Sequence, residues 1–167
     1  MSRLSQIEHR AFTDPVKDWR WTAITVNRGY AAARHVDANN YGPSVIRSIA
    51  APSDRLLYWP EGDKKGMTSL SYEDAVELPI STGRRLYAFD GRSPHEVKRY
   101  DGDVSNRLSI IFFLSARGWK AEPPTVAHLR ELGFIPATDS DDASSFESRF
   151  DVLTGGMAYT SWKVSGD

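Results

Sequence analysis

The sequence predicts a mainly β fold with a few flanking helices. From Trp19 onward, short stretches rich in β-branched and aromatic residues alternate with Gly, Pro, Asn and Asp, as in successive strands and turns. The stretches recur at roughly 8–12-residue intervals, which is typical of sandwiches and barrels. Because 167 residues suit one well-buried domain better than two, we expect 1–167 to form a single domain. Its core is expected at about 20–120, and a C-terminal helix and acidic extension at 121–167.

The composition excludes several classes of site. The chain has no cysteine, so disulfides, zinc ribbons, iron–sulfur clusters and a thiol nucleophile are ruled out. No apolar run approaches the ~20 residues needed to span a membrane, and the N-terminus lacks the apolar core of a signal peptide. We therefore expect a soluble intracellular protein, cytoplasmic or nuclear and not secreted, without a membrane partner.

Charge is distributed unevenly along the chain. Residues 1–120 contain 18 Lys/Arg and 14 Asp/Glu, a balance of +4, whereas residues 121–167 contain 3 and 8, a balance of −5. The first part would accept an anionic substrate, but +4 is too small to indicate nucleic-acid binding by itself. An ordinary solvated surface explains the same numbers.

The predicted strands follow hydrophobic patterns. They are expected at 20–27, 29–36, 44–50, 54–59, 75–80, 84–90, 94–100 and 106–114. In the sixth of these, Leu86 and Ala88 alternate with Tyr87 and Phe89, so the two pairs should face opposite sides of a sheet. The stretch 108–114 is almost wholly apolar, which indicates a central strand buried on both sides.

Helices are expected only at the margins of this β region. Residues 1–13 suit a short amphipathic helix. A second helix is expected at 123–132, because two prolines open it and Gly133 stands at the usual C-terminal glycine position. The Asp/Ser-rich residues 137–147 are expected to form a connection, after which the chain returns as one or two strands.

A candidate metal site is formed by His35, Asp37 and His95. Residues i and i+2 of a strand point to the same side, so His35 and Asp37 should face inward together. Two imidazoles and a carboxylate can hold one face of a ferrous ion and leave the other positions open. A His-x-Asp tripeptide alone is common by chance. A double-stranded, jelly-roll β-helix would bring an early and a late ligand strand together at its mouth.

Arg107 adds a second feature, because it stands at the head of the apolar strand. Burying an unpaired guanidinium is costly, so this arginine needs an anionic partner. A dicarboxylate would supply one through a charge-assisted, two-pronged contact, and Ser109 on the same strand face could donate to the same carboxylate. The alternative is that Arg107 pairs with an Asp or Glu of the chain itself.

Together, His35-x-Asp37, His95 and the triplet Arg107-Leu108-Ser109 resemble the Fe(II)/2-oxoglutarate-dependent dioxygenases in order, spacing and residue type, over roughly residues 20–120. The resemblance implies a cupin-like double-stranded β-helix that uses Fe(II), 2-oxoglutarate as co-substrate and O2 to hydroxylate a C–H bond. It also implies that His35, Asp37 and His95 bind the iron, and that Arg107 and Ser109 bind the co-substrate.

Three fragments resemble the TET/JBP-like branch of this superfamily. They are His35-Val36-Asp37-Ala38-Asn39-Asn40-x-Gly42, Leu56-Leu57-Tyr58-Trp59-Pro60, and Phe89-Asp90-Gly91-x-x-Pro94-His95. That branch oxidises 5-methylpyrimidines, so the resemblance implies a nucleobase in DNA or RNA as the substrate. The chain departs from the branch between Ile49 and Leu56, where a glycine pair is common and this sequence has none.

Asn27-Arg28-Gly29-Tyr30 resembles the Asn-x-Tyr element with which AlkB-like members hold 2-oxoglutarate. This sequence has one additional residue between the Asn and the Tyr. The resemblance implies that Asn27 and Tyr30 bind the co-substrate. The extra residue would put Tyr30 on the opposite strand face unless a bulge at Gly29 restores it.

Arg92, Asn40 and Trp59 are candidate substrate contacts, each with a plainer explanation. Arg92 also suits a solvated turn, Asn40 a turn after the ligand segment, and Trp59 the core or its rim. Two other functions remain open: the same oxygenase chemistry on a small molecule or peptide, and a non-catalytic jelly-roll domain that binds a ligand. The sequence gives no oligomeric state.

Overall fold

The computed structural model describes residues 20–49, 54–62, 66–81, 85–98, 105, 107–119, 121–137 and 159–163. This part of the chain is mainly β with few helices, as predicted. The strands are β1 (Ala23–Arg28), β2 (Asn40–Ile49), β3 (Arg55–Tyr58), β4 (Val76–Leu78), β5 (Arg85–Phe89), β6 (His95–Lys98), β7 (Leu108–Ser115) and β8 (Tyr159–Lys163).

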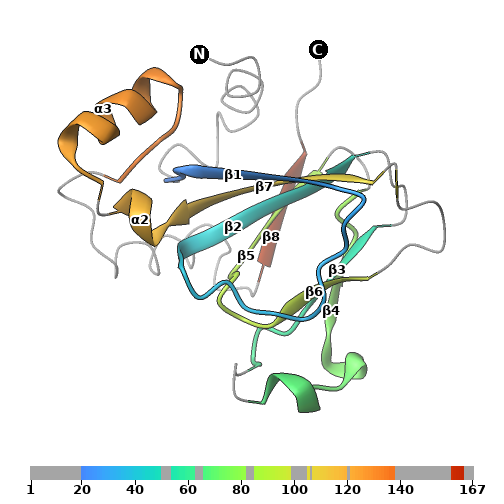
Figure 1. Ribbon diagram of the computed structural model, residues 1–167. Coiled ribbons are helices and arrows are strands. Elements are labelled where there is room, and N and C mark those ends of the chain that lie inside the picture. Colours follow the sequence, from blue (N-terminus) through green and yellow to red (C-terminus); the bar gives the residue numbers. More distant parts are fainter. Residues whose placement is uncertain are drawn as a thin grey trace.

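The strands form two antiparallel sheets (Figure 1). One has five strands in the order β1-β7-β2-β5-β8, and the other has three in the order β4-β3-β6. The apolar strand β7 lies between β1 and β2, where its Ser109 is opposite Asn27 on one side and Ser48 on the other. The prediction of a central strand at 106–114 is therefore confirmed.

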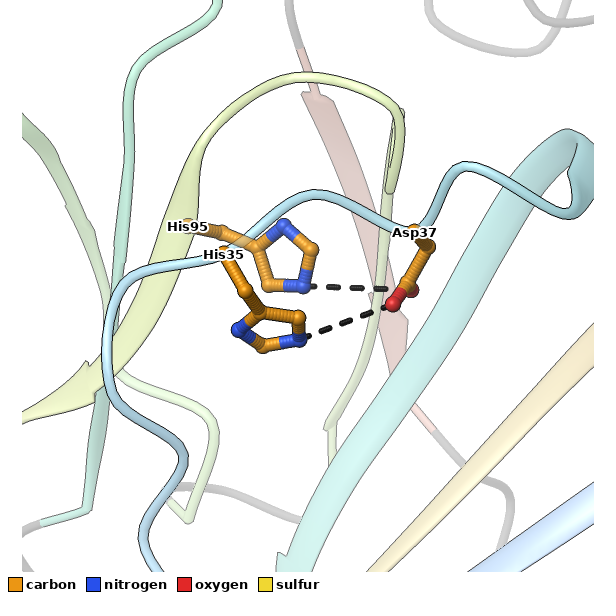
Figure 2. Close-up of side chains that lie close together, drawn as sticks. All are labelled: His35, Asp37 and His95. Atoms are coloured by element: carbon orange, nitrogen blue, oxygen red, sulfur yellow. Dashed lines mark ion pairs between the residues drawn. The ribbon is translucent and has the colours of Figure 1, made fainter. Parts of the chain in front are cut away.

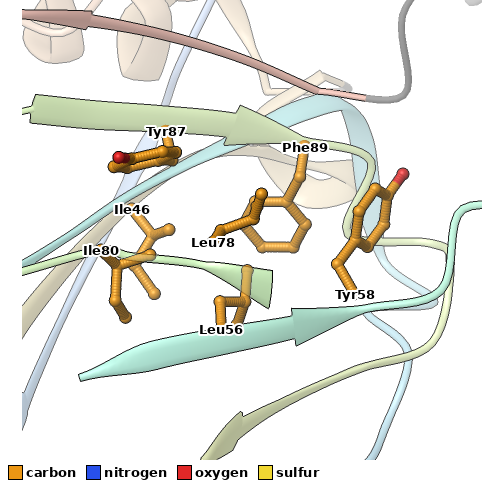
Figure 3. Packing of buried hydrophobic residues seen from close by; sticks show 7 residues of the cluster. All are labelled: Ile46, Leu56, Tyr58, Leu78, Ile80, Tyr87 and Phe89. Carbon is orange, nitrogen blue, oxygen red and sulfur yellow. The ribbon is translucent and has the colours of Figure 1, made fainter. Parts of the chain in front are cut away.

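Two apolar clusters use opposite faces of the five-stranded sheet. The cluster between the sheets comprises Ile46, Leu56, Tyr58, Leu78, Ile80, Tyr87 and Phe89 (Figure 3). The second comprises Trp21, Val45, Leu86, Ala88 and Phe112, with Ile24, Ile110, Phe134 and Ile135 packed against it. The alternation predicted along β5 is confirmed, because successive residues of that strand join different clusters.

Helices lie outside the sheets. After β7 come α2 (Ala116–Trp119) and α3 (Pro123–Glu131), and the loop between β3 and β4 holds the 3-10 helices η1 (Met67–Ser69) and η2 (Tyr72–Asp74), which the sequence did not predict. The helix expected at 123–132 is confirmed. Gly133 follows it with φ 87°, a left-handed conformation that suits glycine. Ile135 then bridges to Trp21.

The strand predicted at 29–36 is wrong, because the chain passes there from one sheet to the other. Gly29 has φ 63°, and β1 ends just before it. Its N–H still donates to the carbonyl of Arg107, the residue just before β7, but from Ala32 onward the backbone forms hydrogen bonds with β6 of the other sheet. Among the described residues, the segment forms one isolated bridge, between His35 and His95, in place of a regular strand.

Some expectations lie outside the described residues, among them the helix at 1–13 and nearly all of the connection at 137–147. The predicted return of the chain near its end is confirmed as one strand, β8, which pairs with β5. In the part of the chain that is described, no helix has the length and apolar character needed to cross a membrane.

Candidate metal centre

The structure brings His35, Asp37 and His95 together, with one donor atom of each within 4.8 Å of the others. In Figure 2 the two imidazole rings lie against each other and both Nε2 atoms face the Asp37 carboxylate. The distances are 3.5 Å from His35 Nε2 to Oδ1 and 3.8 Å from His95 Nε2 to Oδ2. His95 is buried, whereas His35 and Asp37 are partly open to solvent. The site is therefore reached from the side of His35.

Backbone carbonyls fix which nitrogen of each ring faces the site. His35 Nδ1 lies 2.8 Å from the carbonyl oxygen of Ala33, and His95 Nδ1 lies 2.9 Å from that of Ser93. A carbonyl only accepts, so each Nδ1 carries a proton, and in the neutral ring each Nε2 keeps its lone pair for a metal. Such a contact is the usual way in which proteins orient a metal-binding histidine.

The two histidines differ in electrostatic surroundings. The nearby Asp37 carboxylate is the largest influence on His35 and raises its pKa, with a smaller opposing effect of partial burial. Burial dominates at His95 and lowers its pKa, which favours the neutral imidazole. Metals bind the neutral form of the ring.

Asp37 is held from two directions. Its backbone N–H donates to the carbonyl of Gly91 at 2.7 Å. The buried amide of Asn40 donates to Asp37 Oδ2 at 3.0 Å and to Ser44 Oγ at 3.1 Å. A Cβ on Gly91 would lie only 2.9 Å from Asp37 Oδ2 and 2.7 Å from Ser44 Oγ. The carboxylate therefore fits because position 91 has no side chain.

These donors fit a divalent metal ion bound on one face. Ligand atoms at right angles around an ion, with bonds of about 2.1 Å, lie about 3 Å apart. The separations of 3.5 and 3.8 Å are wider than this by less than about 1 Å, which small side-chain rotations can close. Two imidazole nitrogens and one carboxylate are the ligand set of non-haem Fe(II) oxygenases. The donor chemistry and the orientation of both rings thus agree with such an ion.

A cavity of about 540 Å³ opens beside the three side chains. Most of the other predicted site residues line it as well, namely Asn27, Tyr30, Asn40, Arg107 and Ser109. Apolar side chains of both sheets complete the wall, among them Ile46, Leu56, Phe89, Val97 and Ile111. A volume of this size is within the range of small-molecule sites.

Arg107 is buried and its partner is Asp54, an acid of the same chain. Their side chains are only 2% and 0% exposed, and Arg107 Nε forms an ion pair with Asp54 Oδ2. Arg107 Nη1 donates to the carbonyl of Tyr30 and lies 3.4 Å from Ser109 Oγ. The charge of Arg107 is thus balanced internally, so its burial alone does not require a ligand.

Asn27 and Tyr30 reach the same cavity although they are three positions apart. Asn27 lies on β1 opposite Ser109, whereas Tyr30 stands after the end of the strand. The left-handed φ of Gly29 redirects the chain between them. The side chain of Tyr30 is 56% exposed.

Two of the three candidate substrate contacts do not line the cavity. Arg92 is exposed in the turn before β6, and its guanidinium pairs with Asp90 at 3.0 Å. Trp59 is buried, donates from Nε1 to the carbonyl of Ser71 at 2.7 Å and lies under the guanidinium of Arg34. The third, Asn40, lines the cavity and begins β2 rather than lying in the turn.

The sequence reasoning missed three residues near the site. Asp54 was detectable as an acid just before β3, two positions ahead of the apolar pair Leu56-Leu57. Gly91 was visible only as part of an Asp-Gly turn. Arg34, next to His35, contacts Glu96 at 3.3 Å and stacks on Trp59 at 4.0 Å, and no sequence pattern indicated those contacts.

Comparisons with known proteins leave the site to be interpreted from its own geometry. No family model matches the sequence, and no curated protein matches it. One solved structure similar in shape is a point variant of apo ToxT from Vibrio cholerae strain SCE256, with a TM-score of 0.34 and 9% identity, covering 87% of this chain and 44% of that one. A second ToxT structure from Vibrio cholerae has a TM-score of 0.20 and 10% identity, covering 80% and 55%. The chain thus spans about half the length of ToxT, and both TM-scores are too low to indicate a shared fold.

Proposed function

We propose that this chain is an Fe(II)- and 2-oxoglutarate-dependent dioxygenase that hydroxylates a C–H bond. The observation that carries the proposal is the His35, Asp37 and His95 donor set, in which both Nδ1 atoms are tied to backbone carbonyls and both Nε2 atoms face the carboxylate. The sequence resemblance, which rests on the same three residues with Arg107 and Ser109, supports the same activity.

The two facing antiparallel sheets support a jelly-roll, double-stranded β-helix as the scaffold. In that architecture an early and a late segment of the chain meet at the mouth. The bridge between His35 and His95 has this arrangement, since it joins the segment before β2 to the start of β6.

Each side chain then has a defined task. His35, Asp37 and His95 would hold Fe(II), and the bound iron would supply dioxygen activation coupled to decarboxylation of the co-substrate. Arg107 and Ser109, with Asn27 and Tyr30, would orient the distal carboxylate of 2-oxoglutarate in the cavity. The apolar wall would exclude water from the reacting atoms. Asn40 would hold the Asp37 carboxylate rather than touch the substrate.

The proposed substrate is a 5-methylpyrimidine base in DNA or RNA, which rests on the resemblance to the TET/JBP-like branch. A base of this kind would have to leave its stack to enter a cavity. One observation favours the alternative of a small molecule: of the arginines on the described part of the cavity wall, Arg34 already pairs with Glu96, whereas Arg107 pairs with Asp54 and is assigned here to the co-substrate. Neither is therefore available as a simple phosphate contact.

Succinate formation tests the proposal. Protein loaded with Fe(II) and supplied with 2-oxoglutarate and oxygen is assayed against single- and double-stranded DNA containing 5-methylpyrimidines, RNA, free nucleosides, amino acids and short peptides. We expect one class to stimulate succinate release in the parent and in His128→Ala, whose histidine is exposed on α3, but not in His95→Ala. Absence of stimulated and basal turnover in the parent would favour a non-catalytic binding domain.

A further inference from the structure

The ion pair between Arg107 and Asp54 is the least expected feature of the cavity. Asp54 is fully buried where the chain enters β3, and Ser48 Oγ of β2 donates to the same Oδ2 atom that faces Arg107. The pair is therefore held between the two sheets. The contact is an ion pair rather than an aligned hydrogen bond, since Arg107 Nε–H has no hydrogen-bond partner.

Besides Arg107 Nε, two further polar atoms of this pair have no hydrogen-bond partner within the described part of the chain. Among the described residues, Arg107 Nη2 and Asp54 Oδ1 are buried and have no hydrogen-bond partner. Buried polar atoms are rarely left unsatisfied, so Nη2, on a residue of the cavity wall, still has the capacity to donate to a ligand oxygen. A ligand carboxylate would accept a hydrogen bond from Arg107 Nη2, while the charge of Arg107 is already balanced by Asp54.

We infer that Asp54 keeps Arg107 a weak site for a lone carboxylate, so that a dicarboxylate binds firmly only when its other end is held by the metal centre. This inference rests on the proposed function. Asp54 is then a positioning residue that acts through Arg107 and does not touch the co-substrate.

The electrostatic reason is the compensated charge. A bare buried guanidinium attracts any anion strongly, because the surroundings screen it poorly. The Asp54 carboxylate beside Nε cancels much of this attraction. It also occupies the Nε side of the guanidinium, so a ligand carboxylate cannot use Nε and Nη2 together in a two-pronged contact. The remaining contact, through Nη2 and Ser109, is too weak to retain an anion by itself.

A consequence is discrimination between co-substrate and product. The 2-oxo acid end of 2-oxoglutarate would offer a metal one keto and one carboxylate oxygen, whereas in succinate C1 has left as carbon dioxide and the former keto carbon is a simple carboxylate. Weak binding of the distal carboxylate by Arg107 therefore lets succinate dissociate, whereas strong binding would retain it. Asp54 thus favours product release at the cost of some co-substrate affinity.

Glutarate, a five-carbon dicarboxylate without the keto oxygen, isolates the arginine end. Its binding to the metal-free protein is measured by calorimetry in the parent, Asp54→Asn and Ser48→Ala. Asparagine keeps the shape of the side chain and removes its charge, while Ser48→Ala removes a hydrogen bond to Asp54 and leaves the charge. We expect glutarate to bind Asp54→Asn at least about tenfold more tightly than the parent, equivalent to about 1.4 kcal/mol, and Ser48→Ala to resemble the parent. Equal or weaker binding to Asp54→Asn, or the same gain in Ser48→Ala, would overturn the inference.

Asp54→Asn leaves a buried arginine unpaired, and one outcome is a variant that folds only with the ligand. In that event circular dichroism follows its folding as glutarate is added, since a ligand that binds only the folded state stabilises it. Folding driven by glutarate supports the inference, and failure to fold at any concentration overturns it by making Asp54 purely structural. The double variant Asp54→Asn with Arg107→Gln should not respond to glutarate.

Two readouts separate this inference from the proposed function. Glutarate binding needs neither metal nor turnover, whereas succinate formation from 2-oxoglutarate by the parent reports on the oxygenase activity. If the parent turns over and Asp54→Asn does not bind glutarate more tightly, only the role of Asp54 fails. In a parent with turnover, Asp54→Asn should also show stronger inhibition by succinate, by about tenfold.

Discussion

His35 and His95 exchange both of their backbone hydrogen bonds, each N–H donating to the other residue's carbonyl at 2.9 Å. Residues that pair in this way in an antiparallel arrangement have side chains on the same face. The bridge thus places the two imidazoles beside each other, with ring centroids 4.2 Å apart. One pair of backbone hydrogen bonds therefore positions two of the three candidate metal ligands, without a regular strand at His35.

Asn40→Ala should weaken metal binding. The Asn40 amide donates to Asp37 Oδ2, and loss of a partner that orients a ligand typically costs about 10–100-fold in metal affinity. Titration with Fe(II) under anaerobic conditions, or with Mn(II), measures the effect. Asn39→Ala is the matched control, because Asn39 is exposed in the preceding turn. Equal affinities in the two variants would show that Asn40 does not position the ligand.

Gly91→Ala should displace the same carboxylate from the other side. The added Cβ would lie 2.9 Å from Asp37 Oδ2 and 2.7 Å from Ser44 Oγ, so one of these groups has to move. The φ of Gly91 is not left-handed, so the effect comes from contact rather than backbone strain. We expect metal affinity to fall by at least about tenfold while circular dichroism stays that of the parent. Unchanged affinity would mean that Asp37 tolerates the displacement.

Arg107→Gln should destabilise the fold, because it leaves Asp54 as a buried carboxylate without its cation. Breaking a buried ion pair from one side costs about 3–5 kcal/mol. Urea denaturation gives the free energy of unfolding for the parent, this variant and the double variant with Asp54→Asn. The double variant should recover most of the loss, since it removes both charges. Equal stability of the single variant and the parent would contradict the burial of the pair.

Arg107→Lys should separate co-substrate binding from metal binding. Lysine keeps the charge opposite Asp54 but offers a single nitrogen in place of the planar fork. We expect the concentration of 2-oxoglutarate needed for half-maximal turnover to rise at least about tenfold, with Fe(II) affinity close to that of the parent. An unchanged requirement would remove Arg107 from the co-substrate site.

The sequence predicted the mainly β class, seven of the eight strands predicted before residue 120 and the helix at 123–132, because hydrophobic periodicity and turn residues are local signals. It did not predict that residues 29–36 cross between sheets, since that depends on one backbone angle at Gly29 and on bonds to β6. That His35 and Asp37 lie together was predicted from their i, i+2 spacing, and that His95 joins them was implied by the resemblance to the dioxygenases, although the expected strand geometry at His35 was not found.

The supporting residues of the site were harder to predict than the three side chains themselves. Asn40, Gly91 and Asp54 act through contacts with residues distant in space or sequence, and their types are equally common in turns and at strand ends. An internal acid as the partner of Arg107 was one of two alternatives that the sequence left open. Only the fold identifies that acid as Asp54.

The central claim is that His35, Asp37 and His95 hold Fe(II) together with 2-oxoglutarate. Its most direct test is anaerobic visible absorbance of the protein with Fe(II) and 2-oxoglutarate, because an iron–2-oxoglutarate chelate gives a weak charge-transfer band. We expect the band in the parent and in His128→Ala, and its loss in His95→Ala. No band in the parent, or a band of equal strength in His95→Ala, would contradict the account.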